Sequence, residues 1–311
     1  MSETPSACAV VVGHGSIGAR HARLLVAKGM EVRVVSRHAP GAFATTQEAV
    51  GDGRPEYAVV ATPTAAHAGS LEELASAGFS GTVLVEKPIV AASADLPALD
   101  AFAGVQVAYN MRFHPVVREL RRRLDGETVV TANVLAGSWL PDWRPTRELR
   151  TTSSARRADG GGVLRDLSHE LDYAAWIFGP LIADGARGGR LGDLDVDVED
   201  TVGMILHAPR CPLLMVHLTY LDHHAERRVR VTTRRRTLDA DLVRWTLTEG
   251  DRTTRFAVDW DATYVDMHRA ALGGACADLC TVAEALATVE LLERVESWLV
   301  PPGRVRPPPD S

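Results

Sequence analysis

A lysine that directly follows an apolar run is the first residue in this sequence whose position suggests chemistry. In "TVLVEKPIV", residues 82–90, a strand-like run of valine and leucine ends in Glu86, Lys87 and Pro88. Proline lacks a backbone N–H group, so Pro88 prevents the strand from continuing. Ligands of a doubly wound sheet bind outside the carboxyl ends of its strands. The position predicts that Lys87 presents an ammonium group to a ligand cleft, with an ordinary surface lysine as the alternative.

A second candidate pair, Asp166 and His169, follows a run of glycines in "GGGVLRDLSHELDY", residues 160–173. Leucines at steps of three and four residues predict a single helix over residues 163–178. Asp166 and His169 lie on the opposite face of that helix, where the carboxylate can orient the imidazole. Histidine suits the removal of a proton from an alcohol. The alternative is a solvated helix face with a structural histidine.

A glycine-rich loop near the N-terminus matches the pattern G-x-G-x-x-G with Gly13, Gly15 and Gly18. It follows the apolar run 7–12 and opens a helical pattern, which is the context of a dinucleotide-binding loop. The first glycine permits a tight turn, the second lets a pyrophosphate approach the backbone, and the third lets helix and strand pack closely. The N–H groups at the helix start, including those of Ser16 and Ile17, can bind phosphate. A purely structural glycine turn is the alternative.

The residues after the second predicted strand bear on the choice of dinucleotide. A site selective for NAD usually has an acidic residue there that binds the ribose 2′-hydroxyl. This sequence has Ser36 and Arg37 instead. A hydroxyl and a guanidinium suit a 2′-phosphate. We therefore expect NADP(H) in preference to NAD(H), and the alternative is an exposed arginine beside NAD.

The elements that would position these residues alternate between strand and helix in the first third of the chain. Strand patterns occupy residues 7–12, 31–35, 57–61, 83–85 and 105–108. Strands that are apolar on both faces and separated by helices indicate a parallel doubly wound sheet. We expect a Rossmann domain over residues 1–114.

The pattern changes after residue 115. A basic helix (116–124), a strand (128–136), the helix 163–178 and alternating strands between 201 and 258 precede a closing helix at about 278–299. This order predicts an α+β domain over residues 115–300 with an open, largely antiparallel sheet. The proline-rich segment 301–311 is expected to be a disordered tail.

Composition excludes several classes of protein. A formal charge of −6 argues against a general nucleic-acid binder, and the 311 residues suffice for two domains. No apolar run reaches the ~18–20 residues that span a bilayer, and no signal-peptide pattern is present, so we expect a cytoplasmic protein without a membrane partner. Cys276 and Cys280 lie in a helical pattern without further ligands nearby, and we predict no metal site.

Several motifs taken together resemble those of the Gfo/Idh/MocA oxidoreductases. They are "GHGSIG", "ATPTAAH", "EKP", "YNMRFHP" and "GGGVLRDLSHELDY", in that order. The resemblance is strong to about residue 180 and rests beyond that on the sheet-like pattern and the closing helix. It implies the two domains given above and a homodimer or homotetramer. It also implies a cis Lys87–Pro88 bond and a nicotinamide facing Lys87. Further cofactor contacts would come from Thr62, Pro63, His67, Glu86 and Asn110.

The activity implied by the resemblance interconverts a hydroxyl and a carbonyl group by hydride transfer to or from nicotinamide C4. His169 would take or return the hydroxyl proton, Lys87 would hydrogen-bond the same oxygen, and Asp166 would hold His169. In the family the aspartate usually lies four residues before the histidine. Here the spacing is three, while the register of His169 and Asp172 is kept. We interpret this as a one-residue deletion at the helix entrance.

A cluster of arginines precedes this helix and bears on the substrate. The segment 143–157 contains Arg144, Arg147, Arg150, Arg156 and Arg157 against one acid, Glu148. Such a cluster suits a phosphate, a carboxylate or a nucleotide diphosphate, and Trp139 and Trp143 are able to stack on a sugar or base. The alternative is an exposed basic loop. We expect a small-molecule substrate, a sugar or cyclitol derivative with an anionic group. Its binding residues would be Arg112, Trp143, Arg144, Arg147, Arg156 and Asp172.

Two other functions remain open at this point. One is reduction of a C=N or conjugated double bond by an enzyme of the same family. The other is a catalytically inactive regulator that senses the dinucleotide. Such regulators typically lack the lysine or the histidine, and both Lys87 and His169 are present.

Overall fold

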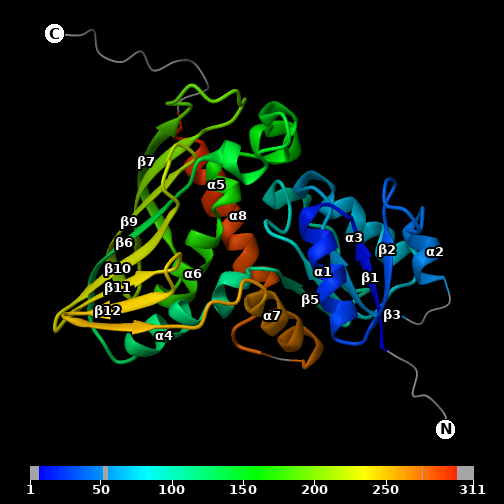
Figure 1. Ribbon diagram of the computed structural model, residues 1–311, viewed down its shortest axis with the longest axis horizontal. Helices are drawn as coiled ribbons and strands as arrows, with labels where there is room; N and C mark the ends of the chain where they lie inside the picture. The colour runs from blue at the N-terminus through cyan, green and yellow to red at the C-terminus, as the bar shows by residue number, and fades with distance from the viewer. Residues whose placement is uncertain (1–6, 52–54, 275, 300–311) are drawn as a thin grey trace. The chain divides into compact units, whose positions relative to one another are not determined.

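The computed structural model describes residues 7–51, 55–274 and 276–299, which form two compact units (Figure 1). The first unit comprises Met1–Phe113 and Asp259–Val289, and the second comprises His114–Val258 and Glu290–Ser311. The sequence predicts continuous domains instead, 1–114 and 115–300. Residues 259–289 join the first unit because their apolar side chains, among them Met267 and Ala271, pack into its core. The predicted disordered tail 301–311 lies outside the described residues.

The first unit contains a six-stranded sheet in the order β14-β5-β4-β3-β1-β2. Five strands are parallel: β1 (Cys8–Val12), β2 (Glu31–Val35), β3 (Pro55–Val60), β4 (Thr82–Val85) and β5 (Gly104–Val107). The short edge strand β14 (Cys280–Thr281) pairs antiparallel with β5. The predicted Rossmann-type sheet is thus confirmed. The helix expected around Cys276 and Cys280 is wrong, because that segment is a turn followed by β14, and all four cysteines are free.

Alternating side chains of β1, β3 and β4 fill two separate cores, one on each face of the sheet. Ala9 and Val11 of β1 pack with α1 (Ser16–Ala27) and α7 (Ala262–Leu272) on one face. Val10 and Val12 pack on the other face with α2 (Thr46–Val50), α3 (His67–Ser76) and the first turns of α8 (Val282–Glu296). Burial on both faces explains why β1 is an uninterrupted apolar run.

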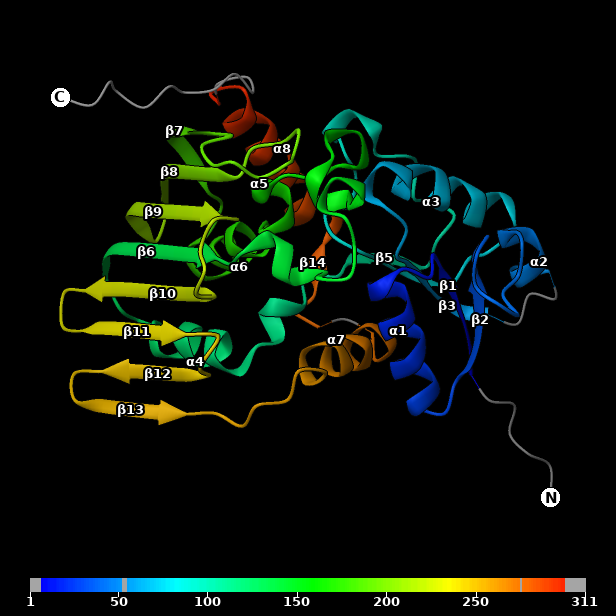
Figure 2. The same cartoon turned by 45° about the horizontal axis from the view of Figure 1, so that its top comes forward.

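The second unit contains an eight-stranded sheet in the order β13-β12-β11-β10-β6-β9-β8-β7 (Figure 2). Within it β6 and β9 are parallel and the other neighbouring strands are antiparallel, as predicted. The strands are β6 (Val129–Gly137), β7 (Ile182–Gly189), β8 (Thr201–Ala208), β9 (Cys211–Thr219), β10 (Glu226–Thr233), β11 (Thr237–Asp241), β12 (Thr246–Glu249) and β13 (Arg252–Arg255).

One face of this sheet carries helices. Helix α4 (Pro115–Arg123) contacts β11 and β12, and α5 (Val163–Asp166) contacts β8 and β9. In β9, Leu214 and Val216 are buried while Leu213 and Met215 are exposed, so the alternation of the sequence corresponds to one covered face.

The single helix predicted over residues 163–178 is wrong. The chain forms α5, which ends at Asp166, and α6 (His169–Phe178), which begins three residues later. At the break, the N–H of Ser168 bonds the carbonyl of Arg165 and that of Glu170 bonds the carbonyl of Leu167. These bonds span three residues instead of four, which tightens the turn. The spacing of the leucines gives no sign of the break, because Leu167 is still buried on the core side.

The segment between β6 and α5 is a succession of short 3₁₀ turns: η4 (Leu140–Trp143), η5 (Leu149–Thr151), η6 (Ser153–Ala155) and η7 (Arg157–Asp159). The first unit has three more: η1 (Thr64–Ala66), η2 (Ser93–Asp95) and η3 (Asn110–Phe113). Among the residues with described positions, none belongs to a helix long and apolar enough to cross a membrane.

Candidate active site

The glycine loop between β1 and α1 has one glycine whose backbone is open to a ligand. Gly13 has a φ of +97°, and a Cβ there would lie 2.6 Å from the carbonyl oxygen of Ala61. A Cβ on Gly18 would overlap the carbonyl oxygen of Gly13. A Cβ on Gly15, in contrast, would have no neighbouring atom within 4 Å. Packing therefore requires the first and third glycines, while the second leaves room for a group to approach the backbone.

The N-terminus of α1 is suited to a phosphate group. Its N-cap is Gly15, and no side chain caps the N–H groups of the first turn. These groups and the helix dipole attract anions. Ser16 beside them is exposed and Ile17 is half-buried. The loop thus fits the pyrophosphate of a dinucleotide, held by backbone N–H groups from Ser16 onward.

The turn after β2 is ordered by Ser36. Its Oγ accepts hydrogen bonds from the N–H groups of His38 and Ala39, both at 3.2 Å. The hydroxyl hydrogen is still able to donate to an anion. Arg37 is exposed, and within the described part of the chain no acid pairs with it. The pair has the chemistry that a phosphate group requires, and the preference for NADP(H) stays a prediction.

Lys87 lies where the strand pattern predicts, at the carboxyl end of β4. The N–H of Glu86 still bonds the carbonyl of Val60 at 2.8 Å, so the β3–β4 pairing extends to that residue. The Lys87–Pro88 bond is cis. The N–H of Lys87 donates to Oε2 of Glu86 at 3.2 Å, and the lysine side chain is half-buried. Because β1 and β4 run in parallel in one sheet, Lys87 shares an edge with the glycine loop.

His67 joins two loops of this edge. Its Nδ1 lies 2.9 Å from the carbonyl oxygen of Pro88, and its Nε2 lies 2.9 Å from that of Thr62. Burial lowers the pKa of its imidazole below the usual range. Both ring nitrogens face backbone carbonyls, so His67 fixes the loops on which Thr62, Pro63 and Lys87 lie. Its predicted position along the cofactor stays a prediction.

Two residues of the predicted binding set are built into the interior of the first unit. Asn110 donates from Nδ2 to Oγ1 of Thr263 at 2.8 Å and is 6% exposed. Arg112 is 1% exposed and bonds Oε2 of Glu284 at 3.2 Å. A charge this deeply buried needs its partner to offset desolvation. Arg112 therefore ties the start of α8 to η3, and its burial does not support the predicted contact with substrate.

A buried chain of polar side chains, which sequence patterns did not reveal, lies behind Glu86. His21 Nε2 is 2.9 Å from Glu86 Oε1, and His21 Nδ1 is 2.8 Å from His268 Nε2. His268 Nδ1 is in turn 2.9 Å from the hydroxyl of Tyr57. The residues come from α1, α7, β3 and the end of β4, and Glu86 is the member nearest to Lys87. No local signal in the sequence relates them.

In the second unit, the glycine run positions the start of α5 against Glu199. A Cβ on Gly161 would overlap the carbonyl of Ser153, and one on Gly162 would overlap the carboxyl of Glu199. Glu199 is 5% exposed, and its Oε1 accepts a hydrogen bond from the N–H of Leu164 at 3.2 Å. The glycines are thus needed because this carboxyl lies directly against the backbone.

Asp166 and His169, both half-buried, lie on opposite sides of the helix break. Asp166 Oδ2 accepts a hydrogen bond of 2.6 Å from the hydroxyl of Tyr220, a buried residue directly after β9. The continuous helix on which the i,i+3 argument rested is interrupted here, and the role of Asp166 in holding His169 stays a prediction. The sequence analysis missed Tyr220, because no local pattern links it to Asp166, which lies 54 positions away in the sequence.

The remaining polar residues of α6 are interior. Glu170 is fully buried and pairs with Arg227 of β10 at 2.7 Å. Asp172, predicted to bind substrate, is 1% exposed. Burial of Tyr173 raises the pKa of its hydroxyl well above 10. Within α6, His169 is therefore the candidate for contact with a ligand, and the polar residues after it belong to the core.

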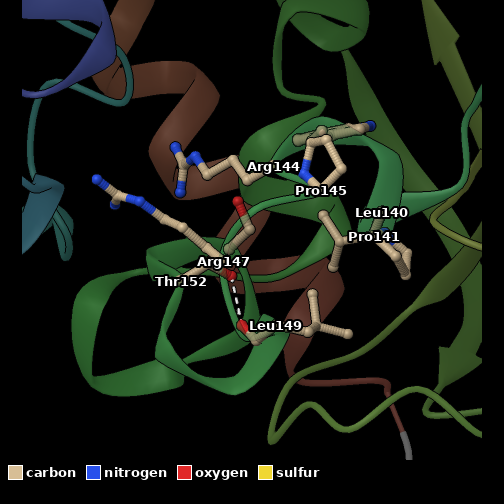
Figure 3. Close-up of a pocket in the computed structure, with 9 residues that line it drawn as sticks. Leu140, Pro141, Arg144, Pro145, Arg147, Leu149 and Thr152 are labelled. Carbon is tan, nitrogen blue, oxygen red and sulfur yellow. Dashed lines mark hydrogen bonds between the residues drawn. The ribbon is translucent and has the colours of Figure 1, made fainter.

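A pocket of about 260 Å³ lies in the segment of 3₁₀ turns (Figure 3). Trp143 is fixed at its rim by a 2.7 Å bond from Nε1 to the hydroxyl of Ser138. Arg144 and Arg147 extend their guanidinium groups to the same side, and within the described residues neither pairs with an acid (Figure 3). The lining consists of Leu140, Pro141, Trp143, Arg144, Pro145, Arg147, Leu149, Thr152 and Ser154.

The other arginines of the predicted cluster have acidic neighbours. Arg150 pairs with Glu148 at 2.6 Å, and Arg156 pairs with Asp159 at 3.3 Å. The backbone N–H of Arg157 donates to Oδ1 of Asp197 at 2.6 Å. Trp139 stacks near the ring of His223. The structure therefore brings Trp143, Arg144 and Arg147 to one pocket and leaves Arg156 outside its lining.

Replacement of Glu199 by glutamine is expected to stabilise the protein at alkaline pH. Burial raises the pKa of Glu199 from 4.5 to about 7. The folded state thus holds a proton that the unfolded state releases above its lower pKa. The stability this proton provides is complete below pH 4.5 and is lost as pH rises through about 7. In urea denaturation, Glu199→Gln should exceed wild type by roughly 2–3 kcal/mol at about pH 8.5 and match it at about pH 5. Equal pH slopes in both proteins would contradict this.

Comparison with known proteins identifies the class of both units. Residues 8–107 match the model of an oxidoreductase family with an NAD-binding Rossmann fold. Residues 117–239 match the model of the GFO/IDH/MocA C-terminal domain. Together the matches cover more than two thirds of the chain and define an oxidoreductase with an NAD-binding domain. The chain belongs to the Gfo/Idh/MocA family.

Solved structures share this fold at low sequence identity. GenD2 from gentamicin A biosynthesis, in complex with NAD, is 24% identical with a TM-score of 0.77, over 94% of each chain. UDP-N-acetylglucosamine 3-dehydrogenase GnnA from Acidithiobacillus ferrooxidans is 16% identical with a TM-score of 0.77, over 94% of this chain and 97% of its own. Levoglucosan dehydrogenase with NADH and L-sorbose is 15% identical with a TM-score of 0.78, over 94% and 96%. No curated protein gave a significant match.

Proposed function

We propose that the protein interconverts a hydroxyl and a carbonyl group on a sugar, sugar derivative or cyclitol with a nicotinamide dinucleotide. The observation that carries the proposal is the position of Lys87, at the same sheet edge as the open glycine loop. An ammonium group at that edge is available to a substrate oxygen next to a bound dinucleotide.

The roles of the residues follow from their chemistry. The bound cofactor supplies or accepts hydride at nicotinamide C4. Lys87 hydrogen-bonds the substrate oxygen and stabilises the negative charge that develops on it. His169, at the first turn of α6, takes the proton from the same oxygen or returns it. Asp166, held by Tyr220 at 2.6 Å, positions the start of α6. The joint action of Lys87 and His169 on one oxygen is part of the proposal, and the family resemblance supports it.

The substrate class is supported by the pocket and by the relatives. The names of the similar solved structures include a UDP-N-acetylglucosamine dehydrogenase and a levoglucosan dehydrogenase. For this chain, Arg144 and Arg147 at an apolar pocket favour a substrate that carries a phosphate or carboxylate. Trp143 provides an aromatic surface for a sugar ring or a base.

The preferred dinucleotide is NADP(H) in this proposal. Ser36 and Arg37 stand where a site selective for NAD usually has an acid, and Arg37 has no acidic partner within the described residues. Its charge suits a 2′-phosphate.

The test is a screen of the purified protein with NADP+ and NAD+, followed by the absorbance of the reduced nicotinamide. Free sugars, cyclitols, their phosphates and nucleotide sugars form the panel for the oxidised cofactors, and ketones and imines form the panel for NADPH and NADH. We expect turnover with one of these classes, a higher kcat/KM for the phosphorylated member of each matched pair, and a higher kcat/KM with NADP+. Tight NADPH binding without turnover of any alcohol, ketone or imine would favour a dinucleotide sensor. Turnover confined to imines would favour C=N reduction.

A pair of arginine variants tests the anionic subsite. Arg147→Gln should raise KM for the phosphorylated substrate by about 10- to 100-fold, because one charge-assisted hydrogen bond to the phosphate is lost. It should leave KM for the neutral analogue nearly unchanged. Arg150→Gln is the matched control, since Arg150 pairs with Glu148 and does not line the pocket. Equal effects of both variants, or on both substrates, would remove the pocket from the substrate site.

A further inference from the structure

The chain runs from the buried Tyr57 to Glu86, which is half-buried. Tyr57, His21 and His268 are each 0% exposed. Burial is the main cause that lowers the pKa of His268 to about 3, so its imidazole is neutral. Burial also raises the pKa of the Tyr57 hydroxyl above its usual value, so the hydroxyl keeps its proton. Two neutral groups thus meet at the inner end of the chain.

The proton of His268 can be assigned from its partners. If Nδ1 carried the hydrogen, it would donate to the Tyr57 oxygen, and the hydroxyl hydrogen would then lack an acceptor among the described residues. A buried donor without an acceptor is unfavourable. The hydroxyl of Tyr57 therefore donates to Nδ1, and His268 carries its hydrogen on Nε2.

The same argument then assigns His21. Nε2–H of His268 donates to Nδ1 of His21, which must be an acceptor. His21 consequently carries its hydrogen on Nε2 and donates it to Oε1 of Glu86. All hydrogens point the same way, from Tyr57 toward the carboxylate. The other oxygen of that carboxylate accepts from the backbone N–H of Lys87.

We propose that Tyr57, His268 and His21 are positioning residues, which orient the carboxylate of Glu86, and through it the backbone of Lys87, by a one-directional chain of hydrogen bonds. Tyr57 determines the direction of the hydrogen bonds, because its single hydroxyl hydrogen has Nδ1 of His268 as its one acceptor among the described residues. Glu86 is thereby an acceptor at both oxygens, and the peptide that carries the Lys87 side chain is fixed. The effect on turnover rests on the proposed function of Lys87, whereas the direction of the chain does not.

The direction is tested on wild-type protein by nitrogen NMR with labelled histidine. Both His21 and His268 should have a protonated Nε2 and an unprotonated Nδ1 near neutral pH. Single His→Gln variants at each position assign the signals. A protonated Nδ1 on either ring, or an imidazolium at His21, would overturn the proposal. This measurement needs no substrate, so its outcome is independent of the enzymatic assignment.

Tyr57→Phe tests whether the Tyr57 hydroxyl sets the direction of the hydrogen bonds. Without the hydroxyl, Nδ1 of His268 lacks a partner in either direction. Because the Glu86 carboxylate cannot donate, Nε2 of His21 keeps its hydrogen in both directions, and the reversed direction makes His21 an imidazolium. We therefore expect mixed protonation at both nitrogens of His268 and at Nδ1 of His21, with Nε2 of His21 protonated throughout. We also expect kcat to fall about tenfold, the factor equivalent to one hydrogen bond of about 1.4 kcal/mol, with a smaller change in KM. Tyr173→Phe, which removes another fully buried hydroxyl, should leave both histidine spectra unchanged. Wild-type kcat in Tyr57→Phe would contradict the positioning role even if the spectra change.

Discussion

Replacement of Lys87 by methionine should lower kcat roughly 10²- to 10³-fold, the usual cost of removing one group that stabilises an oxyanion. Methionine keeps most of the length and the apolar part of the side chain and removes the ammonium charge. Dinucleotide binding should change far less than kcat, because the glycine loop and the N-terminus of α1 remain intact. Stopped-flow measurement of hydride transfer and titration of NADPH fluorescence separate the two effects.

The sequence offers a matched control for this experiment. It contains one other lysine, Lys28, which is exposed at the end of α1. Lys28→Met makes the same chemical change away from the sheet edge and should retain kcat. Turnover of Lys87→Met within a few-fold of wild type would show that the ammonium group has no catalytic role.

Local sequence patterns were enough to predict β1, the glycine loop and the end of β4, which lie at the edge of the sheet where the dinucleotide is proposed to bind. The run from Cys8 to Val12 is apolar at every position, because both of its faces are covered. Gly18 is required by the carbonyl of Gly13 and Gly13 by the backbone of Ala61 after β3, but the two glycines lie five residues apart, so their spacing can be recognised without the fold. Pro88 marks the end of β4 in the same local way. The position of Lys87 was predictable for this reason.

Features that depend on distant residues were not predictable. His21 meets His268 across 247 positions, and Tyr57 meets it across 211. Each of these residues alone reads as an ordinary core side chain. The sequence does not indicate the break between α5 and α6 either, because the leucines remain on the buried side when the turn tightens. The prediction of one continuous helix failed there, and the argument from helical spacing for Asp166 and His169 does not apply across the break.

Arg112 and Asp172 illustrate a different error. Both were assigned from their place in motifs, and both prove to be 1% exposed. A motif indicates that a residue type is needed at a position, but the need can be a buried ion pair as well as a ligand contact. Arg112 bonds Glu284, which lies 172 residues away, and this contact is invisible before the fold is known. Burial therefore decides between the two meanings of a motif.

Replacement of His169 by asparagine should lower kcat/KM for alcohol oxidation by about 10²- to 10⁴-fold, the range for loss of a general base. Asparagine retains polarity and approximate size but cannot take a proton. The limb of the pH–rate profile that reports the base should be missing, and oxidation should keep rising with pH as hydroxide replaces the imidazole. Lys87→Met, in contrast, should keep that limb at a lower overall rate.

The control is His207→Asn, which removes a half-buried histidine of β8 paired with Asp184 at 2.8 Å. It should keep both the rate and the wild-type profile. If His169→Asn retained a wild-type profile, the proton would have to leave through another group. Because Glu170 and Asp172 are buried, no other acid or base of α6 is exposed enough to replace His169 in contact with a substrate. The loss of the limb in one variant and its retention in the other would therefore assign the proton to His169 and the charge to Lys87.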